Sequence, residues 1–356
     1  MRVGAFVLAA QFPGQSQREP LHRAIRTGEV AEQSGLDSVW LAEHHFVPYG
    51  VCPSAVTLAA LLLGRTRRIS VGTAVTVLPN AHPVALGEQA ALLHLTSGGR
   101  FALGVGRGGP WVDLEVFGGG LDAYEHGFPE SLDLLLRWLR EARVGTDGER
   151  YQFREVEVVP RCDEPFAPAE VAPGTAQLSS PSVVVACTSP GTVRLAAQRG
   201  LPMLLGMHCD DEEKAEAIAM WRREAREAGH GHEEIEHAAS LHVSAGVAQV
   251  GDNTKEAAES LTKTMPGWFR EGLGAHRTVD GRQRTMRDPH GYTELLCRLH
   301  PVGTPQLCAD RLAETRERTG ISRFALLVEG TGDLAATERN VQRLGEEVLT
   351  QFPLAQ

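Results

Sequence analysis

The amino-acid sequence predicts an α/β fold, a (β/α)8 barrel that extends over residues 1–356 as a single domain. Short apolar runs alternate with longer amphipathic runs along most of the chain, which is the order of a repeated strand–helix unit. The short runs are apolar at successive positions, so the strands are expected to be buried on both faces of a parallel sheet. Eight such units match the number in a closed barrel, and a doubly wound open sheet is the alternative architecture.

The expected strands are short and rich in β-branched or small apolar residues. They cover residues 3–8, 38–41, 69–73, 101–105, 182–187, 203–205, 241–248 and 324–328. The expected helices repeat their apolar residues at a spacing of three and four. They cover residues 19–34, 54–65, 84–95, 128–143, 192–199, 212–228, 255–270, 305–318 and 334–349.

Two segments interrupt this alternation. Residues 145–180 are rich in Pro, Gly and acidic residues and too long for an ordinary connection; a small hairpin is expected near residues 151–159. Residues 272–301 are polar, rich in Arg and weakly patterned. Loops of that length are often active-site lids or disordered segments, so both a mobile lid and plain disorder are open for this second segment.

The composition excludes several classes of protein. A formal net charge of −10 and the absence of a basic run in the sequence argue against binding to nucleic acid or to an anionic membrane. No apolar segment approaches the length of about 18 residues that a transmembrane helix requires. The six cysteines are scattered without a C-x-x-C pair, as is typical of free thiols in a reducing compartment. The composition therefore predicts a cytoplasmic enzyme.

The stretch WLAEHHF, residues 40–46, places three titratable side chains directly after an expected strand. Such groups are rarely buried unless they are paired or hydrogen-bonded, so Glu43, His44 and His45 indicate the floor of a pocket. Histidine titrates near neutral pH, which makes His44 and His45 candidates for proton transfer. Two adjacent histidines that serve only as hydrogen-bonded structure are the alternative.

Residues 104–109, GVGRGG, follow an expected strand and match the pattern G-x-G-x-x-G. A dinucleotide-binding fingerprint needs a helix to begin at this point, whereas Pro110 and the glycine cluster at 118–120 follow. The glycines are better explained as space for a flat ligand over a strand end. Arg107 then supplies a cation, and its planar guanidinium suits a phosphate because it binds oxyanions through two parallel hydrogen bonds.

Residues 188–192, TSPGT, join an expected strand to an expected helix. Hydroxyl groups in this position are good helix N-caps, and capping alone would explain them. The same geometry offers backbone N–H groups and a favourable dipole to an anion. Because the loops after the later strands of a (β/α)8 barrel commonly bind phosphate, we favour a phosphate site here.

Residues 72–83 form an expected strand that continues into a turn ending at His82-Pro83. Taken alone, this stretch is explained by a strand followed by an X-Pro turn, with His82 at a helix start. A metal site needs three or four converging ligands. Glu43, His44, His45 and His82 could supply them, but nothing in their spacing requires it, so no metal is expected.

Several of these stretches resemble the bacterial luciferase family of flavin-dependent monooxygenases, and the chain is similar to the luciferase α subunit almost from end to end. The matching motifs are FVLAAQFP (6–13), WLAEHHF (40–46), GTAVTVLPNAHPV (72–84), GRFALGVGRG (99–108), VVACTSPGTVRLAAQRGLPM (184–203) and PVGTP (301–305). The resemblance implies a luciferase-like (β/α)8 barrel and a two-component monooxygenase. It also implies reduced FMN as co-substrate, dioxygen activation through a flavin 4a-peroxide and a separate flavin reductase. It further implies a homodimer packed through the helices at 54–65 and 84–95.

The resemblance also implies roles for individual residues. His44 matches the family's catalytic histidine, with Glu43 and His45 as its neighbours. Ala74 and Val75 match a cis peptide beneath the flavin ring. The remaining positions match contacts of the flavin: Arg107, Ser189 and Thr192 to the phosphate and Thr188 to the ring through its backbone.

Two departures limit what the resemblance implies. Gly106 stands where the light-emitting α subunit has a reactive cysteine, and Glu125 stands where it has a second phosphate-binding arginine, for which His126 or Arg100 could compensate. Neither bioluminescence nor a long-chain aldehyde substrate is therefore expected. The expected role is that of family members that hydroxylate, epoxidise or insert oxygen into a small specialised metabolite.

The sequence leaves open which residues line the substrate pocket, and it allows two rival functions. Phe6, Phe46 and Trp111 are expected either as apolar walls for a flat or bulky substrate or as core residues. Hydride transfer with a deazaflavin, without oxygen, is one rival function within the same superfamily. A non-catalytic flavin-binding partner subunit is the other, and retention of His44 and Arg107 argues against it.

Overall fold

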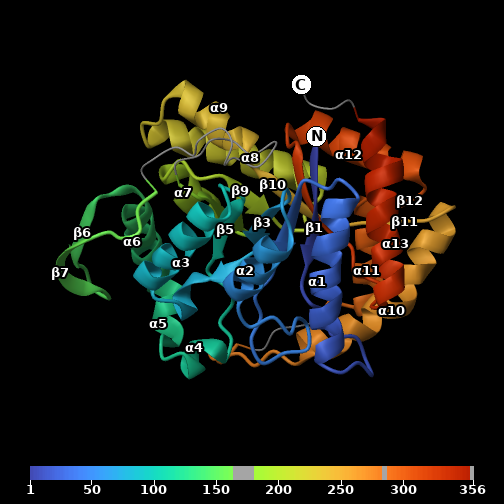
Figure 1. The fold of residues 1–356 in the computed structure, drawn as a ribbon, viewed down its shortest axis with the longest axis horizontal. Coiled ribbons are helices and arrows are strands. Elements are labelled where there is room, and N and C mark those ends of the chain that lie inside the picture. The colour runs from blue at the N-terminus through green and yellow to red at the C-terminus, as the bar shows by residue number, and fades with distance from the viewer. Residues whose placement is uncertain (163–179, 283–286, 353–356) are drawn as a thin grey trace.

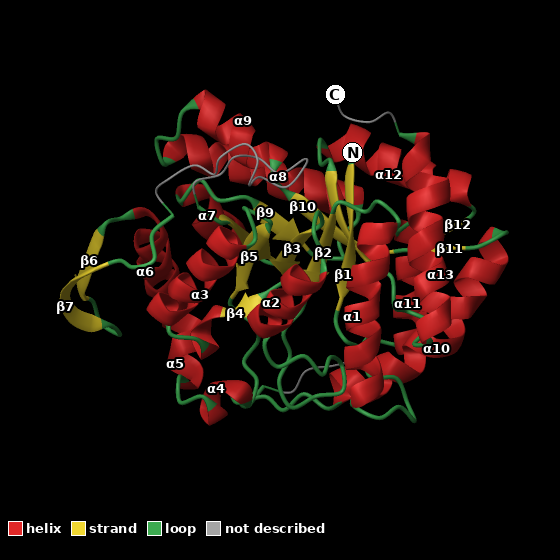
Figure 2. Ribbon diagram, in the orientation of Figure 1, coloured by secondary structure: helices red, strands yellow, loops and turns green. Residues whose placement is uncertain are grey.

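The structure, a computed structural model, describes residues 1–162, 180–282 and 287–352. Within these residues, eight parallel strands form a closed barrel surrounded by helices (Figure 1 and Figure 2). The barrel strands are β1 (Arg2–Val7), β2 (Ser38–Leu41), β3 (Ser70–Thr73), β5 (Phe101–Gly106), β8 (Ser182–Cys187), β9 (Met203–Leu205), β10 (Val243–Val247) and β13 (Arg323–Leu327).

The order of these strands confirms the prediction of a (β/α)8 barrel. Around the barrel it is β3-β2-β1-β13-β10-β9-β8-β5, and β5 pairs back with β3 through Val71 and Phe101. This last pairing excludes the doubly wound alternative, because an open sheet leaves its two edge strands unpaired. All eight predicted strands are present, each within two residues of the expected bounds at either end.

The predicted helices cover the outside of the barrel. They are α1 (Arg18–Gln33), α2 (Ala55–Arg65), α3 (Pro83–Thr96), α6 (Phe128–Arg140), α7 (Pro190–Gln198), α8 (Asp211–Glu227), α10 (Thr254–Gly274), α12 (Pro305–Thr319) and α13 (Leu334–Arg343). Several begin at a side chain that accepts a hydrogen bond from the third backbone N–H of the helix, which satisfies a donor that has no partner inside the helix. These N-caps are Ser54, Ser189, Asp210, Asn253, Thr304 and Asp333.

Shorter elements connect or flank these strands and helices. They are β4 (Thr76–Val77), η1 (Leu78–Asn80), α4 (Asp113–Val116), α5 (Gly120–Asp122), η2 (Ala123–Gly127), β6 (Arg143–Asp147), β7 (Gln152–Glu157), α9 (His232–Ser240), β11 (Gln249–Val250), α11 (Pro289–Leu299), β12 (Val302–Gly303), η3 (Leu344–Val348) and η4 (Leu349–Gln351). The carboxyl ends of the barrel strands face the lower edge of Figure 1 and Figure 2, where α4 and α5 lie.

Two predictions about the irregular segments need correction. The helix predicted at 128–143 ends at Arg140, because Arg143 begins β6, which pairs antiparallel with β7. The hairpin expected near 151–159 is therefore present but starts earlier in the chain. The expectation that 272–301 is irregular is wrong for 289–299, which form α11. Asp288 caps this helix by accepting from the N–H of Gly291 at 2.7 Å. The lid prediction is otherwise untested at 283–286, as is the rest of the first segment at 163–179, since both lie outside the described residues.

Side chains fill the interior of the barrel below its carboxyl end. Phe6, Trp40, Ala74 and Val184 belong to one buried cluster inside the strands. A Cβ on Gly72 would lie 2.6 Å from the ring of Trp40, so the absence of a side chain there makes room for the indole. Open space for a ligand is therefore expected above this layer.

Among the described residues, none of the helices has the length and apolar character needed to cross a bilayer.

Candidate active site

A cavity of about 350 Å³ lies at the carboxyl ends of β2, β3 and β5. This is the face at which (β/α)8 barrels carry their active sites, because eight loops converge there. The cavity brings together six of the residues singled out from sequence, namely Glu43, His44, His45, Ala74, Val75 and Trp111. Its remaining lining residues are Ala42, Tyr49, Val77, Gly108, Gly109, Asp113, Leu273 and His276.

Glu43 fixes the loop that carries the histidines. Its carboxylate accepts the backbone N–H of Ala55, at the start of α2, at 3.2 Å and that of Val77, in β4, at 3.1 Å. Nε2 of His45 lies 3.5 Å from Oε1 of the same carboxylate. Glu43 therefore joins the loops after β2 and β3, and Nε2 of His45, which has no hydrogen-bond partner, lies beside its carboxylate.

His44 lies deeper than His45 and has its ring packed into the protein. A Cβ on Gly50 would lie 2.8 Å from Nδ1 of His44, so glycine at that position makes room for the imidazole. Nδ1 is buried without a hydrogen-bond partner, and the ring meets that of Tyr49 edge-on at 4.9 Å. Burial, together with nearby His276 and His45, lowers the pKa of His44 to about 3. At neutral pH the ring of His44 is therefore uncharged.

The rim of the cavity next to His45 is aromatic. The ring of His45 lies 4.9 Å from that of Phe117, and Phe46 stacks on Phe117 at 6.1 Å. Phe46 is 59% exposed and Phe117 is 47% exposed. Of the three aromatic walls considered from sequence, only Trp111 lines the cavity. Phe46 lies on the rim, and Phe6 is buried in the barrel interior as a core residue.

The floor of the cavity is formed by Ala74 and Val75, which are joined by a cis peptide bond, as the resemblance implied. Gly106 of the adjacent β5 lies against this floor. A Cβ on Gly106 would come within 2.6 Å of Cγ2 of Val75 and 3.5 Å of Cβ of Ala186. Val75 and a side chain at position 106 therefore compete for the same space, so Gly106 does not leave a void beside the floor.

Arg107 directly follows β5. Its guanidinium carbon lies 4.3 Å from the ring centre of Tyr124, a cation–π contact that holds the charge in place. Nε of Arg107 is buried and has no hydrogen-bond partner. A buried donor without an acceptor costs about 1–3 kcal/mol, and an oxyanion at this position would satisfy it.

The phosphate-site candidates of the 188–192 stretch lie at the end of the neighbouring strand. Since Val105 in β5 pairs with Val185 in β8, Arg107 and Ser189 leave the barrel side by side. Ser189 and Thr192 form a reciprocal capping box at the start of α7: Ser189 Oγ accepts the N–H of Thr192 at 3.4 Å, and Thr192 Oγ1 accepts the N–H of Ser189 at 3.2 Å. Capping is thus present, and exposed Thr188 lies next to it.

The suggestion that Arg100 replaces the second phosphate-binding arginine is wrong. Arg100 lies at the amino end of β5, the opposite end of the barrel from Arg107. It is buried there and donates to the carbonyl groups of Ser97, Ile69 and Leu63. His126 and Glu125 are both exposed, and His126 lies 3.0 Å from Asp122. His82 caps α3 by accepting the N–H of Val84 at 3.3 Å, as the turn interpretation predicted.

Sequence patterns did not single out four residues of the cavity wall. Tyr49 and Asp113 follow β2 and β5, and Leu273 and His276 come from the end of α10 and the chain after it. Asp113 is 6% exposed and accepts from Nδ2 of Asn80 at 2.7 Å. Tyr49 and Asp113 could have been found from the sequence, because each lies a few residues after a strand. Leu273 and His276 lay in a weakly patterned segment that offered no such signal.

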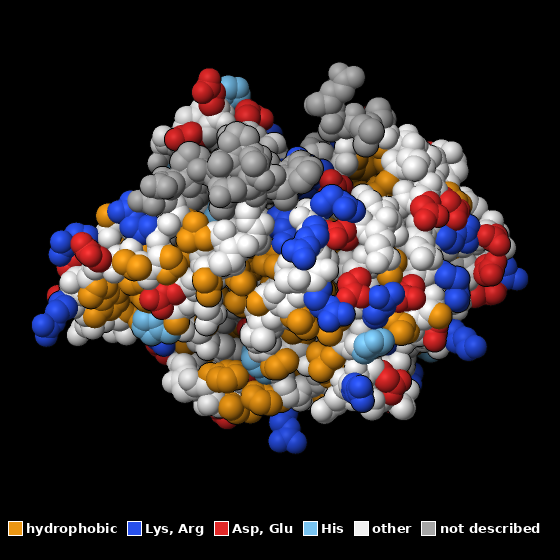
Figure 3. Space-filling view, in the orientation of Figure 1, with side chains coloured by type: hydrophobic (Ala, Val, Ile, Leu, Met, Phe, Trp, Pro, Cys, Tyr) orange, Lys and Arg blue, Asp and Glu red, His pale blue; other side chains and the backbone are white. Residues whose placement is uncertain are grey.

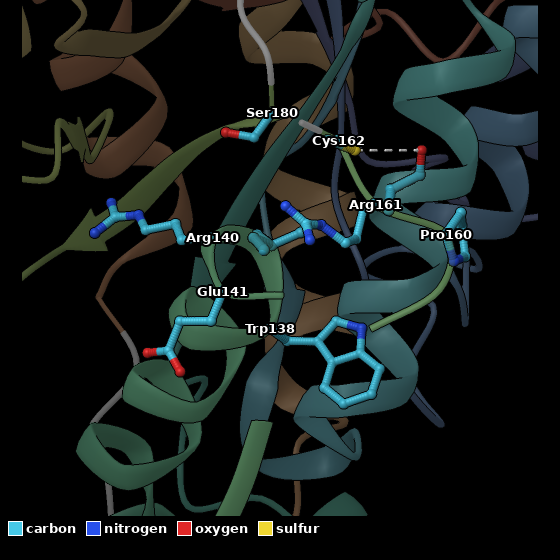
Figure 4. A pocket seen from close by; sticks show the side chains of 9 residues that line it. Trp138, Arg140, Glu141, Pro160, Arg161, Cys162 and Ser180 are labelled. Atoms are coloured by element: carbon cyan, nitrogen blue, oxygen red, sulfur yellow. Dashed lines mark hydrogen bonds between the residues drawn. The ribbon is translucent and has the colours of Figure 1, made fainter. Parts of the chain in front are cut away.

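A second cavity, of about 220 Å³, shares no lining residue with this site, and Figure 4 shows the side chains that line it. Its lining side chains come from α3, α6 and the chain after β7 and include Trp138, Glu141 and Cys162. The thiol of Cys162 faces the carbonyl oxygen of Ala91 at 3.9 Å. Because α6 runs antiparallel to the strands, its last residues lie toward the amino end of the barrel.

Among the described residues, no group of three or more His, Cys, Asp or Glu side chains is arranged to hold a metal.

Comparison with known proteins gives matches over nearly the whole chain. The alkanal monooxygenase alpha chain of the Kryptophanaron alfredi symbiont is 30% identical over 349 residues, which cover 93% of each chain. That of Photorhabdus luminescens is 31% identical over 349 residues, which cover 93% of this chain and 92% of the relative.

Solved structures with the same fold include enzymes that use different flavin cofactors. The crystal structure of monooxygenase RslO1 from Streptomyces bottropensis matches with a TM-score of 0.81 and 22% identity, covering 99% of this chain and 100% of that one. The oxygenating constituent of 3,6-diketocamphane monooxygenase from Pseudomonas putida, in complex with FMN, matches with a TM-score of 0.74 and 20% identity. The match covers 100% of this chain and 99% of that one. An F420-dependent secondary alcohol dehydrogenase matches with a TM-score of 0.69 and 15% identity, covering 99% of each chain. At these identities the structures bear on the fold alone.

The sequence profile described as luciferase-like monooxygenase matches residues 1–323. This match spans most of the barrel, from β1 to the start of β13, and includes every residue of the cavity described above. The chain therefore belongs to the luciferase-like monooxygenase family.

Proposed function

We propose that this chain is the oxygenating component of a two-component monooxygenase that uses reduced FMN and dioxygen to oxygenate a small organic substrate. A separate reductase supplies the reduced flavin. The cavity at the carboxyl end of the barrel supports the proposal most directly, because it combines two histidines with an apolar floor at Ala74 and Val75. Reduced FMN, when bound, supplies the electrons that activate dioxygen.

The side chains next to the cavity fit a flavin with a phosphate group. Arg107 offers a buried Nε that lacks an acceptor, and in the first turn of α7 the N–H of Gly191 lies outside the capping box of Ser189 and Thr192. These groups would hold the phosphate, with Ser189 and Thr192 at its edge. The flat floor at Ala74 and Val75 would support the ring system. A Cβ on Gly109 would lie 2.2 Å from Nε1 of Trp111, and one on Gly108 would lie 2.8 Å from Cγ1 of Val77, so these glycines make room for two residues of the cavity wall.

Within this site, we assign proton acceptance to His44. Its ring is uncharged at neutral pH and is oriented by Gly50 and Tyr49. A positioned base typically contributes about 10²- to 10⁴-fold to a rate. Glu43 and His45 hold the loop in place around it, and Trp111 forms part of the wall that keeps water from the reacting atoms.

The proposal is tested by mixing the protein anaerobically with reduced FMN and then with oxygenated buffer while recording absorbance. We expect a transient band that differs from both reduced and oxidised FMN and is absent without protein. Arg107→Ala should weaken binding of reduced FMN by about 10- to 150-fold, because one charge-assisted contact is lost, with little change in thermal stability. Equal binding by the variant would contradict the phosphate assignment.

The same experiment separates two rival functions. Hydride transfer with a deazaflavin is supported by the F420-dependent relatives of the same fold. It predicts that FMN oxidises at its free-solution rate and that a deazaflavin binds instead. A non-catalytic flavin-binding subunit predicts flavin binding without a transient band or any oxygenated product.

We also propose that the chain forms a homodimer through α2 and α3. Apolar side chains gather over these two adjacent helices (Figure 3), and Leu61 of α2 and Leu92 of α3 are 43% and 54% exposed. Exposed apolar patches of this kind commonly mark protein interfaces. Sedimentation velocity should give a dimer for the wild type and a monomer for Leu61→Glu/Leu92→Glu. Val156→Glu, on the hairpin, should remain dimeric. A wild-type monomer at micromolar concentration would sink the idea.

A further inference from the structure

The chain that follows α10 crosses the mouth of the cavity and is fixed to the loop after β5. The N–H of Val112 donates to the carbonyl of Arg277 at 2.9 Å, and that of Val279 donates to the carbonyl of Pro110 at 2.9 Å. Trp111 and Thr278 form an antiparallel bridge between these two bonds. This pairing places His276 in the wall of the cavity, next to His44 and Trp111.

The ring of His276 has one nitrogen engaged and is held by two aromatic neighbours. Nδ1 lies 3.2 Å from the carbonyl oxygen of Leu273. Because a carbonyl oxygen can only accept, Nδ1 carries a proton, and Nε2 is the nitrogen available to exchange one. The ring centre lies 4.6 Å from that of Trp111 and 6.2 Å from that of Tyr49.

His276 has partners for a positive charge that His44 lacks. Burial lowers the pKa of His276, but the hydrogen bond to Leu273 and the carboxylate of Asp113 oppose that shift. His44 has no such partner: its Nδ1 is buried and unpaired, and its pKa falls to about 3. The titratable groups around His276 are Asp113, His44 and Tyr49, of which Asp113 is the acidic one.

We propose that His276 is a second proton-transfer residue of this cavity, which donates a proton from Nε2; this assignment rests on the proposed function. In one turnover, one atom of dioxygen enters the substrate and the other leaves as water. Reduced FMN, when bound, would supply the two electrons and the two protons that this requires. His276 delivers a proton to the oxygen that becomes water and regains one of the two protons, so the protein is unchanged at the end.

The protonation of His276 is tested first in the protein without flavin. A protonated imidazole quenches the fluorescence of an adjacent indole, and the ring of Trp111 lies against His276. On acidification from about pH 8 to about pH 4, we expect a quenching step with a midpoint below the ordinary pKa of histidine. The step should be lost in His276→Gln and in Trp111→Phe. It should persist in His232→Gln, which changes an exposed histidine on α9. Identical titrations of the wild type and His276→Gln would overturn the proposal.

The second test measures turnover with reduced FMN and dioxygen. His276→Gln should bind reduced FMN within about threefold of the wild type but form product about 10²-fold more slowly. The wild-type rate should fall as the pH rises through the titration of His276, and this dependence should be absent in the variant. If the wild type turns over and His276→Gln matches its rate and pH profile, the role of His276 is refuted while the proposed function stands. If the wild type neither binds reduced FMN nor forms product, the proposed function fails, and the inference fails with it whatever the fluorescence shows.

Discussion

Replacement of His44 by alanine is expected to slow product formation by about 10²- to 10⁴-fold, the range typical of a lost general base. The imidazole occupies a fixed place, since Gly50 leaves room for Nδ1 and the ring meets Tyr49 edge-on at 4.9 Å. Burial keeps it uncharged at neutral pH, with a pKa of about 3. Because Nδ1 of His44 has no hydrogen-bond partner, the expected loss of stability is limited to the packing of the ring against Tyr49.

The loss at His44 should appear in turnover and not in binding. Reduced FMN should bind His44→Ala within about threefold of the wild type, because its phosphate is assigned to Arg107 and α7. His232→Ala, an exposed histidine on α9, is the matched control and should keep full turnover. A variant that turns over at the wild-type rate would remove His44 from the chemistry. One that fails to bind flavin would make it a binding residue.

Arg23→Ala is expected to lower the free energy of unfolding by about 3–5 kcal/mol, the usual cost of leaving a buried charge without its partner. Nε of Arg23 lies 3.3 Å from Oε2 of Glu329, and the two side chains are 2% and 0% exposed. Arg23 also donates to the carbonyl groups of Ala10 and Gly332, and Glu329 accepts the N–H of Leu8 at 2.7 Å. This network joins α1 to the ends of β1 and β13 beneath the site.

The loss in Arg23→Ala should depend on pH. Burial raises the pKa of Glu329 even with Arg23 present, and removal of the arginine raises it further. The folded variant then holds the proton to a higher pH than the unfolded chain, so its stability falls as the pH rises through that interval.

Denaturant unfolding at about pH 5 and about pH 8 measures this difference. Arg26→Ala is the control: Arg26 is 36% exposed and pairs with Glu338 at the surface, where an ion pair contributes about 0–1 kcal/mol. Equal losses for the two variants would mean that the buried pair contributes no more than the exposed one.

The sequence by itself predicted eight strand–helix units and the end of the strands at which the site lies. The eight strands are apolar on both faces, and the spacing of apolar residues indicates the helices between them, so these units followed from local patterns. Closure of the barrel depends on the pairing of β5 with β3, which the structure shows. Glu43, His44 and His45 follow a strand, and the carboxyl ends of parallel strands meet at one edge. The family resemblance implied the place of Ala74 and Val75 and left Trp111 open between a cavity wall and a core residue; all three line the cavity.

Only the tertiary structure decided which residues from distant segments meet. His276 reaches the cavity because the chain after α10 pairs with the loop after β5, and Arg23 meets Glu329 across 306 residues of chain. It also placed Arg100 at the wrong end of the barrel for a phosphate and showed Phe6 to be core. Local pattern fixes the strand to which a residue belongs. The end of the barrel it faces and the partner it meets depend on strand direction, loop paths and close packing, which act between residues far apart in sequence.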